Sequence, residues 1–180
     1  MITANFNLDK FQERVAQMSI NIIFGSDGGA TKGVASKLRK KTQGRVVDIK
    51  EATTDDFENC ELLIIGSPTY GDGTLQTDWE DNIDKLRSAN LQGKRVAIFG
   101  TGDQETYPLS FQNAMGILYD EVIALGAEVI GFTETDGYDF VESTAVRDDK
   151  FVGLALDLDT QSGMTEKRLT AWLASILAPA

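Results

Sequence analysis

Short apolar runs alternate with helix-like stretches along this chain of 180 residues. The run at residues 62–65 consists of four consecutive aliphatic residues and is followed by Gly66. Strands that are apolar on both faces are typical of a parallel sheet covered by helices on either side. Strands are predicted over residues 19–25, 45–49, 61–66 and 95–99 and from about residue 128, and helices over 31–41, 54–58, 78–88, 111–125 and 165–177. Because parallel strands need right-handed crossovers, we expect an α/β fold with an open, doubly wound five-stranded sheet in three α/β/α layers.

Two segments lie outside this alternation. Residues 133–160 separate the fifth strand from the last helix and contain a second apolar run at 151–158, so we expect an insertion that splits the fifth strand. Residues 1–18 precede the first strand, and Leu8, Phe11, Val15 and Met18 have the spacing of one helix face. We therefore expect an N-terminal extension over residues 1–18 with a helical pattern, and one domain over residues 19–180.

The composition excludes several kinds of site. The chain has no histidine and a single cysteine, Cys60, which excludes histidine triads, histidine metal sites and an internal disulfide. A net charge of -11 disfavours binding to nucleic acid or anionic membranes and favours basic partners.

No apolar stretch approaches the roughly 20 residues that a membrane span needs. Asp9, Lys10, Glu13 and Arg14 interrupt the start of the chain, unlike a secretory signal, so we expect a cytoplasmic protein, and a monomer.

A glycine-rich loop joins the first predicted strand to the first predicted helix, with the sequence GSDGGAT at residues 25–31. Glycines let a backbone approach a phosphate closely, and the start of a helix offers N–H donors with partial positive charge. Ser26 and Thr31 add hydroxyl groups. The loop therefore predicts a phosphate site, at the sheet edge where doubly wound folds bind their ligands.

Other phosphate loops fit these residues less well. A nucleotide P-loop requires a lysine before its final Ser or Thr, and Ala30 stands at that place. A dinucleotide fingerprint requires the spacing G-x-G-x-x-G, which Ser26 and Asp27 break. For this loop on its own, a purely structural turn remains an alternative. The loop contains no lysine or arginine, so a bound phosphate would keep its negative charge nearby.

Two further loops each carry one tyrosine. The third predicted strand is followed by GSPTYGDG at residues 66–73, and the fourth by GTGDQETY at residues 100–107. Tyr70 and Tyr107, presented from neighbouring strand ends, can enclose a planar ring between them. Each tyrosine taken alone could equally pack on the surface of its loop.

These loops together resemble the flavodoxin family. The motifs are GSDGGAT at residues 25–31, SPTYGDGTLQTDWED at 67–81, FGTGDQETYP at 99–108, DGYDF at 136–140 and KFVGLALDLD at 150–159. They follow the family's order over about residues 19–178, and the insertion matches the long-chain type. The resemblance implies a flavodoxin-like sheet of strand order 2-1-3-4-5 that binds flavin mononucleotide (FMN) without a covalent bond.

The resemblance also implies a role for each loop. The loop from Ser26 to Thr31 would hold the phosphate with help from Thr69. Tyr70 and Tyr107 would cover the two faces of the isoalloxazine ring. Thr101, Gly102 and Asp103 would line its pyrimidine edge, with Asp103 accepting from N3–H, and Gln112 and Asp159 would contact the loop or the ribityl side. The implied cofactor-binding residues are Ser26, Asp27, Gly28, Gly29, Ala30, Thr31, Thr69, Tyr70, Gly71, Asp72, Gly73, Thr101, Gly102, Asp103, Tyr107, Gln112 and Asp159.

Three of these residues depart from the usual pattern of the family. Gly28 stands where the family usually has a hydroxyl-bearing or polar residue, and Ala30 occupies a position that is often polar. We therefore expect a weaker hold on the phosphate than in most relatives. Tyr70 stands where many long-chain members have tryptophan. No catalytic residue and no metal ligand is implied.

The function that the resemblance implies is electron transfer, not substrate turnover. FMN can take one or two electrons, and the carrier would cycle between semiquinone and hydroquinone at low potential. The Gly71–Asp72 peptide is expected to rotate so that the Gly71 carbonyl accepts a bond from N5 of the reduced flavin, because glycine tolerates positive φ. The phosphate and the carboxylates of Asp72, Asp103, Asp157 and Asp159 would disfavour a further negative charge on the flavin.

Redox proteins are the implied partners. The donors would be an NADP-linked flavoprotein reductase, a photosystem or a pyruvate oxidoreductase, and the acceptors nitrogenase or other reductive enzymes. Such partners would dock on an acidic face beside the flavin, which comprises Asp72, Asp78, Glu80, Asp81, Glu105 and Asp139.

Three other functions remain open for this fold. An FMN-dependent NAD(P)H-quinone reductase would need a pocket for a second substrate over the ring. A phosphorylated receiver domain would need an aspartate at the end of the third strand, where Gly66, Ser67 and Pro68 stand. A domain that has lost its flavin would only bind partners.

Overall fold

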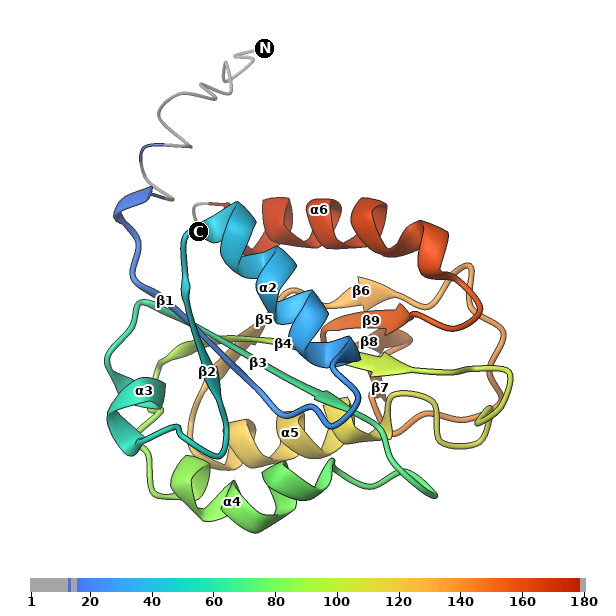
Figure 1. Cartoon of the computed structure of the whole chain (residues 1–180), viewed down its shortest axis with the longest axis horizontal. Helices are drawn as coiled ribbons and strands as arrows, with labels where there is room; N and C mark the ends of the chain where they lie inside the picture. Colours follow the sequence, from blue (N-terminus) through green and yellow to red (C-terminus); the bar gives the residue numbers. More distant parts are fainter. Residues whose placement is uncertain (1–12, 14–15, 179–180) are drawn as a thin grey trace.

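The computed structural model describes residues 13 and 16–178 and contains a central parallel sheet of six strands (Figure 1). Its strands are β1 (Ile20–Phe24), β2 (Arg45–Asp48), β3 (Leu62–Pro68), β4 (Arg95–Gly102), β5 (Glu128–Ile130) and β9 (Leu154–Asp157). The strand order is β2-β1-β3-β4-β5, and β9 also pairs with β4. The predicted doubly wound parallel sheet and its order are confirmed.

The fifth position of the sheet is shared by two short strands. β5 pairs with residues 95–97 of β4, and β9 pairs with residues 99–102 of the same strand. The chain returns to β4 at Gly153, where a Cβ would lie 2.0 Å from the carbonyl oxygen of Ile98. Only a glycine allows this close approach between the two pairings. The expected split of the fifth strand by the insertion is therefore confirmed.

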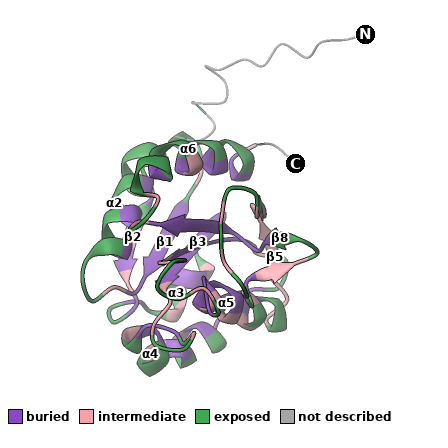
Figure 2. Cartoon of the chain, turned by 90° about the vertical axis from the view of Figure 1, so that its right-hand side faces the viewer, coloured by how far each residue is buried: buried purple, intermediate pink, exposed green. Residues whose placement is uncertain are grey.

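Helices cover both faces of the sheet. In the view of Figure 1, α2 (Ala30–Thr42) and α6 (Thr165–Ile176) lie above it, and α3 (Thr54–Glu58), α4 (Thr77–Arg87) and α5 (Asn113–Ala124) lie below. Successive residues of β3 point to opposite faces: Leu62 and Ile64 pack on the side of α2 and α6, and Leu63 and Ile65 on the side of α4 and α5. Figure 2 shows these buried strands between helices that expose their outer faces.

The insertion between β5 and β9 has its own small sheet. β6 (Thr133–Glu134), β8 (Lys150–Phe151) and β7 (Val146–Arg147) pair in that order, antiparallel. Tyr138, Phe140 and Phe151 of this segment pack around Phe111, with ring centroids 5.5 to 6.0 Å from it. A 3-10 turn, η1 (Ser162–Met164), leads into α6. The two-residue strands carried no periodic signal in the sequence, and the aromatic cluster holds the insertion on the main domain.

Three element boundaries differ from the sequence predictions by two residues or more. β3 and β4 each extend beyond the predicted ends at residues 66 and 99, because Ser67 pairs with Gly100 and Pro68 with Thr101. Gly66 does not end its strand: a Cβ there would lie 2.1 Å from the ring of Phe99. α5 begins at Asn113 and not at residue 111, since the backbone of Gln112 is left-handed, with φ 63°.

The predicted extension over residues 1–18 lies largely outside the described residues, so the division of the chain at residue 18 stays a prediction.

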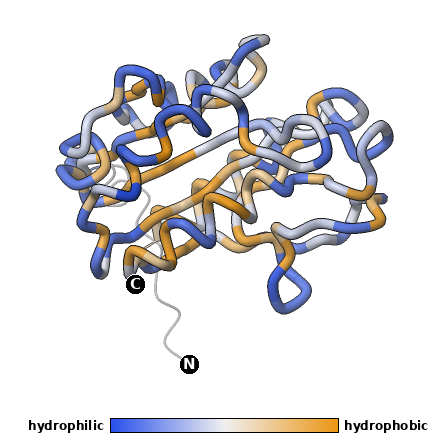
Figure 3. Tube along the Cα trace, turned by 90° about the horizontal axis from the view of Figure 1, so that it is seen from below, coloured by the Kyte–Doolittle hydropathy of each residue, from blue (hydrophilic) through white to orange (hydrophobic). Residues whose placement is uncertain are grey.

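Hydrophobic segments gather in the central strands and on the inner sides of the helices, while hydrophilic loops lie at the periphery (Figure 3). Within the described residues, every helix is too short or too polar to cross a bilayer.

Candidate functional site

The carboxyl ends of β1, β3 and β4 open into one cavity of about 350 Å³. The lining residues are Ser26, Gly28, Ala30, Thr31, Pro68, Thr69, Tyr70, Gly71, Thr101, Gly102, Asp103, Tyr107, Leu158 and Asp159. They come from the three loops that the sequence singled out and from the residues that follow β9. This is the edge at which ligands of doubly wound sheets bind.

The loop from Gly25 to Ala30 makes a tight turn into α2. Gly29 has a left-handed backbone, with φ 87°, and its N–H donates to the hydroxyl of Ser26 at 3.1 Å. Thr31 is fully buried in the first turn of the helix, and its hydroxyl lies 2.9 Å from that of Thr101 at the end of β4. The start of α2 thus presents backbone N–H groups and hydroxyls to the cavity, which is the donor set that a phosphate requires.

The loop after β3 is a short hairpin that carries Tyr70 at the cavity. Tyr70 bridges Thr74, and the N–H of Thr74 donates to the carbonyl oxygen of Tyr70 at 2.8 Å. Burial and a hydrogen bond to the carboxylate of Asp27 raise the pKa of Tyr70 above its ordinary value. Gly71 at the tip has φ 49°, and a Cβ there would meet no atom within 4 Å.

The loop after β4 is organised by the carboxylate of Asp103. Its Oδ1 accepts from the N–H groups of Glu105 at 3.0 Å and Thr106 at 2.9 Å. Hydrogen bonds from the hydroxyl and N–H of Thr106, with the bond from Glu105, lower the pKa of Asp103. The N–H of Tyr107 donates to the Asp103 carbonyl oxygen at 3.0 Å, and Tyr107 leaves half of its surface exposed beside the cavity.

A buried hydrogen-bond network, which the sequence reasoning missed, joins this loop to the end of β9 and the residues that follow it. The Oδ2 of Asp157 accepts from the N–H of Gln104 at 3.2 Å, and its Oδ1 accepts from the N–H of Thr160 at 2.8 Å. The Gln104 amide bonds the Thr160 hydroxyl at 3.3 Å and accepts from the N–H of Asp139 at 2.6 Å. Gln104 and Asp157 are almost fully buried. No sequence motif predicts that Gln104 and Asp157 are buried, although the sequence does show an aspartate, Asp157, within the apolar run at residues 151–158.

The structure brings most predicted site residues to the cavity but not all of them. Asp27, Gly29, Asp72, Gly73 and Gln112 do not line it. The first four belong to its loops, and all of them except Gly73 are sequence neighbours of lining residues. Gln112 is fully buried, and its Nε2 donates to the carbonyl oxygen of Leu156 at 3.0 Å, so it supports the site from behind β4. Pro68 and Leu158 line the cavity and were not predicted to contact a ligand.

The hydroxyl of Thr69 has a structural partner. It accepts from the N–H of Ala114 at 3.1 Å, which fixes the start of α5 against the loop after β3. A threonine hydroxyl can still donate to a ligand while it accepts from a backbone N–H. The predicted contact between Thr69 and a phosphate therefore stays open as a prediction.

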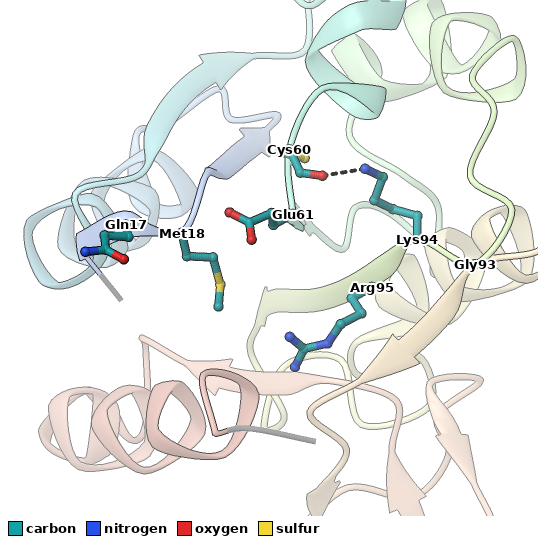
Figure 4. Close-up of a pocket in the computed structure, with 7 residues that line it drawn as sticks. All are labelled: Gln17, Met18, Cys60, Glu61, Gly93, Lys94 and Arg95. Atoms are coloured by element: carbon teal, nitrogen blue, oxygen red, sulfur yellow. Dashed lines mark hydrogen bonds between the residues drawn. The ribbon is translucent and has the colours of Figure 1, made fainter. Parts of the chain in front are cut away.

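A second cavity, of about 570 Å³, lies at the amino edge of the sheet (Figure 4). Its lysine and arginine bond backbone carbonyl groups: Lys94 donates to Glu58 at 2.7 Å and to Cys60, and Arg95 donates to Ile176 at 3.0 Å. These cations thus bind carbonyl oxygens at the carboxyl-terminal ends of α3 and α6. The thiol of Cys60 is buried, which raises its pKa. The chemistry-bearing loops all lie at the opposite edge.

The charges around the first cavity are one-sided. Its lining contains Asp103 and Asp159 and, within the described part of the chain, no lysine or arginine. The described residues also contain no group of three or more Cys, Asp or Glu side chains that could hold a metal ion. The cavity therefore suits a ligand that neutral donors and aromatic rings can hold.

Comparison with known proteins identifies the family. The flavodoxin profile matches residues 22–172. A flavodoxin of Synechocystis sp. is 45% identical over 161 residues, covering 87% of this chain and 95% of that protein. A flavodoxin of Klebsiella pneumoniae is 41% identical over 170 residues, covering 88% and 96%. The crystal structure of Fusobacterium nucleatum flavodoxin bound to FMN superposes with a TM-score of 0.83 at 34% identity, covering 88% of this chain and 96% of that one. The chain belongs to the flavodoxin family.

Proposed function

We propose that this protein carries electrons one at a time on a non-covalently bound FMN, as a redox partner of other proteins. The observation that carries the proposal is the cavity at the carboxyl edge of the sheet. There the glycine-rich loop at the start of α2, with its hydroxyl groups, meets the two loops that carry Tyr70 and Tyr107. Family membership supports the same reading, because flavodoxins are electron-transfer proteins and not enzymes that turn over a substrate.

The residues present fit the phosphate end of FMN. Ser26 and Thr31 supply hydroxyls, and the start of α2 supplies N–H groups with partial positive charge. Neutral donors alone can hold a phosphate, although Gly28 and Ala30 add no side-chain donor. The hold on phosphate therefore rests on backbone geometry, which the left-handed Gly29 sets.

The other half of the cavity fits the flavin ring. Tyr70 and Tyr107 line it from two loops and can each cover one face of a planar ring. Asp103 lines the same cavity, and its pKa is lowered, so its carboxylate can accept a bond from an N–H of the ring. Its orientation is fixed by the N–H groups of Glu105 and Thr106.

The surroundings favour a low reduction potential. Bound FMN supplies the one-electron chemistry. The protein contributes negative charges that no nearby cation compensates. Asp103 and Asp159 line the cavity. The buried Asp157 accepts from the N–H of Gln104, and among the described residues no lysine or arginine lies within 4 Å of its carboxylate. Such charges disfavour the addition of an electron, and burial reduces their screening.

We further propose the face beside Tyr107 as the docking surface for redox proteins. Leu109 and Val141 are 64% and 67% exposed, the two largest values among the exposed large hydrophobic side chains described. Their loops are joined, since the N–H groups of Val141 and Glu142 donate to the carbonyl oxygen of Pro108 at 2.8 and 2.9 Å. Glu105, Asp139 and Glu142 lie within four residues of this apolar pair in the sequence and are exposed. The matching partner has an apolar spot bordered by lysine or arginine.

The purified protein tests the proposed function directly. We expect flavin absorption bands and, in an anaerobic redox titration, two separated one-electron steps, the second at low potential. A colourless protein that takes up no FMN would contradict the cofactor. Steady NAD(P)H–quinone turnover would instead favour a quinone reductase of the same fold.

A further inference from the structure

Gln76 is a buried residue that contacts the phosphate loop from outside the cavity. Its side chain is fully buried at the N-terminus of α4, where Oε1 accepts from the N–H of Trp79 at 3.3 Å. Its Nε2 donates to Oδ1 of Asp27 and to Oδ2 of Asp78, each at 2.8 Å. The amide thus joins the start of α4 to the loop between β1 and α2.

The space for this contact exists because residue 25 is glycine. A Cβ on Gly25 would lie 2.1 Å from Oε1 of Gln76 and 2.6 Å from Cδ1 of Trp79. The indole N–H of Trp79 donates to the carbonyl oxygen of Gly66 at 2.9 Å, which fixes the ring in place. Gln76 and Trp79 therefore lie directly against the first residue of the phosphate loop.

Asp27 is the one charged residue between Gly25 and Thr31. A carboxylate that turned into the cavity would repel a phosphate. The structure keeps it out: Ser26 and Gly28 line the cavity, and Asp27 between them does not. Its carboxylate instead accepts from the amide of Gln76.

The two carboxylates that Gln76 holds are not equivalent. Asp78 has a cation, since the Nζ of Lys50 lies 3.3 Å from its Oδ2. Asp27 has no lysine or arginine within 4 Å among the described residues. The Gln76 amide is thus the donor that fixes where the Asp27 carboxylate lies.

We propose that Gln76 is a positioning residue for the phosphate loop, whose amide holds the Asp27 carboxylate outside the cavity and so sets the preference for a phosphorylated flavin. The inference rests on the proposed function, namely that the cavity binds FMN. Gln76 itself lies outside the lining and acts through Asp27.

The test compares FMN with riboflavin, which lacks the phosphate. The full-length apoprotein is titrated with each flavin, and quenching of flavin fluorescence gives both dissociation constants. Gln76→Glu replaces the two donated bonds by charge repulsion, so FMN should bind about 10-fold more weakly and riboflavin almost unchanged. If both flavins weaken equally, Gln76 only supports the fold and the proposal is wrong.

Three further variants make the result specific. Gln76→Met keeps the side-chain volume but loses both donors, and it should lower the preference for FMN even if the charged variant does not fold. Asn82→Asp is the matched control six residues further along α4, where the amide donates to the Asp78 carbonyl oxygen at 2.9 Å. Its preference should equal that of the wild type. In an Asp27→Ala background, Gln76→Met should change the preference little, and a full effect there would overturn the proposal.

The wild type separates this inference from the proposed function. If it binds FMN no more tightly than riboflavin, the phosphate site itself is contradicted, and the role of Gln76 falls with it. If it prefers FMN and the Gln76 variants keep that preference, only the positioning role is wrong.

Discussion

The side-chain oxygens of Thr31 and Thr101 lie 2.9 Å apart, in a hydrogen bond between the first turn of α2 and the end of β4. Both residues are buried, and both line the cavity. The bond joins the part of the cavity proposed for the phosphate to the part proposed for the ring. This contact therefore helps to hold the two halves of the site in register.

Thr101→Val should weaken both the fold and FMN binding. Valine keeps the shape but leaves the buried Thr31 hydroxyl without this partner, which costs about 1 to 2 kcal/mol. Urea unfolding of the apoprotein measures the stability, and flavin titration the affinity. Thr42→Val is the control, because its hydroxyl bonds Leu38 within α2, away from the cavity. Thr42→Val should lose similar stability and bind FMN normally, and normal FMN binding by Thr101→Val would contradict a coupling role.

Gly25→Ala should destabilise the protein by about 1 to 3 kcal/mol, the usual cost of overpacking. The added methyl group would meet Gln76 and Trp79, which are both fully buried and cannot move aside easily. Gly28→Ala provides the comparison in the same loop, since its Cβ would meet no atom within 4 Å. Thermal unfolding of the two apoproteins should show a clear loss for the first variant only. Similar melting temperatures would show that α4 shifts freely.

The sequence predicted the sheet well because hydrophobic burial on both faces leaves a strong, local pattern. The run at residues 62–65 could be read directly as a buried strand. The ends were less predictable, because Gly66 and Pro68 read as terminators while pairing with β4 continues through them. Whether a glycine ends a strand or makes room for a ring such as that of Phe99 depends on a residue more than 30 positions away.

The site was predictable where loops carry a recognisable motif and unpredictable where a residue acts through others. Tyr70 and Tyr107 were visible because they follow strand ends. Gln76 and Gln104 were not, since their importance lies in burial and in partners such as Asp27 and Asp157 that are distant in sequence. Gln112 shows the opposite case: the family resemblance implied a contact with the loop or the ribityl side, whereas in the structure its Nε2 donates to the carbonyl oxygen of Leu156.

Gly71→Ala should narrow the gap between the two one-electron potentials by some tens of millivolts. Gly71 has φ 49° and open space around its Cβ, so alanine would meet no clash but would resist peptide rotation. One net hydrogen bond of about 1 kcal/mol corresponds to that shift. Gly93→Ala is the matched control: it also has positive φ, 70°, and open space, but lies at the opposite edge of the sheet. An unchanged gap in Gly71→Ala under anaerobic titration would exclude the rotation.

Asp103→Asn should remove an acid-sensitive part of the stability. Hydrogen bonds from Thr106 and Glu105 lower the pKa of Asp103 in the folded protein. A lowered pKa contributes stability that is present above the unfolded value, about 3.9, and is lost as the pH falls through the folded value. The wild type should therefore exceed the variant in stability at pH 6, and the difference should shrink below about pH 4. Urea unfolding at several pH values checks this, and a difference independent of pH would refute it.

Replacing Leu109 and Val141 by serine should slow electron transfer to a protein partner and leave the flavin unchanged. Both side chains are largely exposed beside Tyr107, so their removal costs little stability, while a docked partner loses apolar contact. Rates with an acceptor protein should fall several-fold, and rates with a small acceptor such as ferricyanide should not. Ile123→Ser is the control, since this residue is 44% exposed near the far end of α5. If the double variant reduces the protein partner as fast as this control does, docking does not use the apolar pair. The neighbouring carboxylates alone would then have to account for any decrease of the rate with added salt.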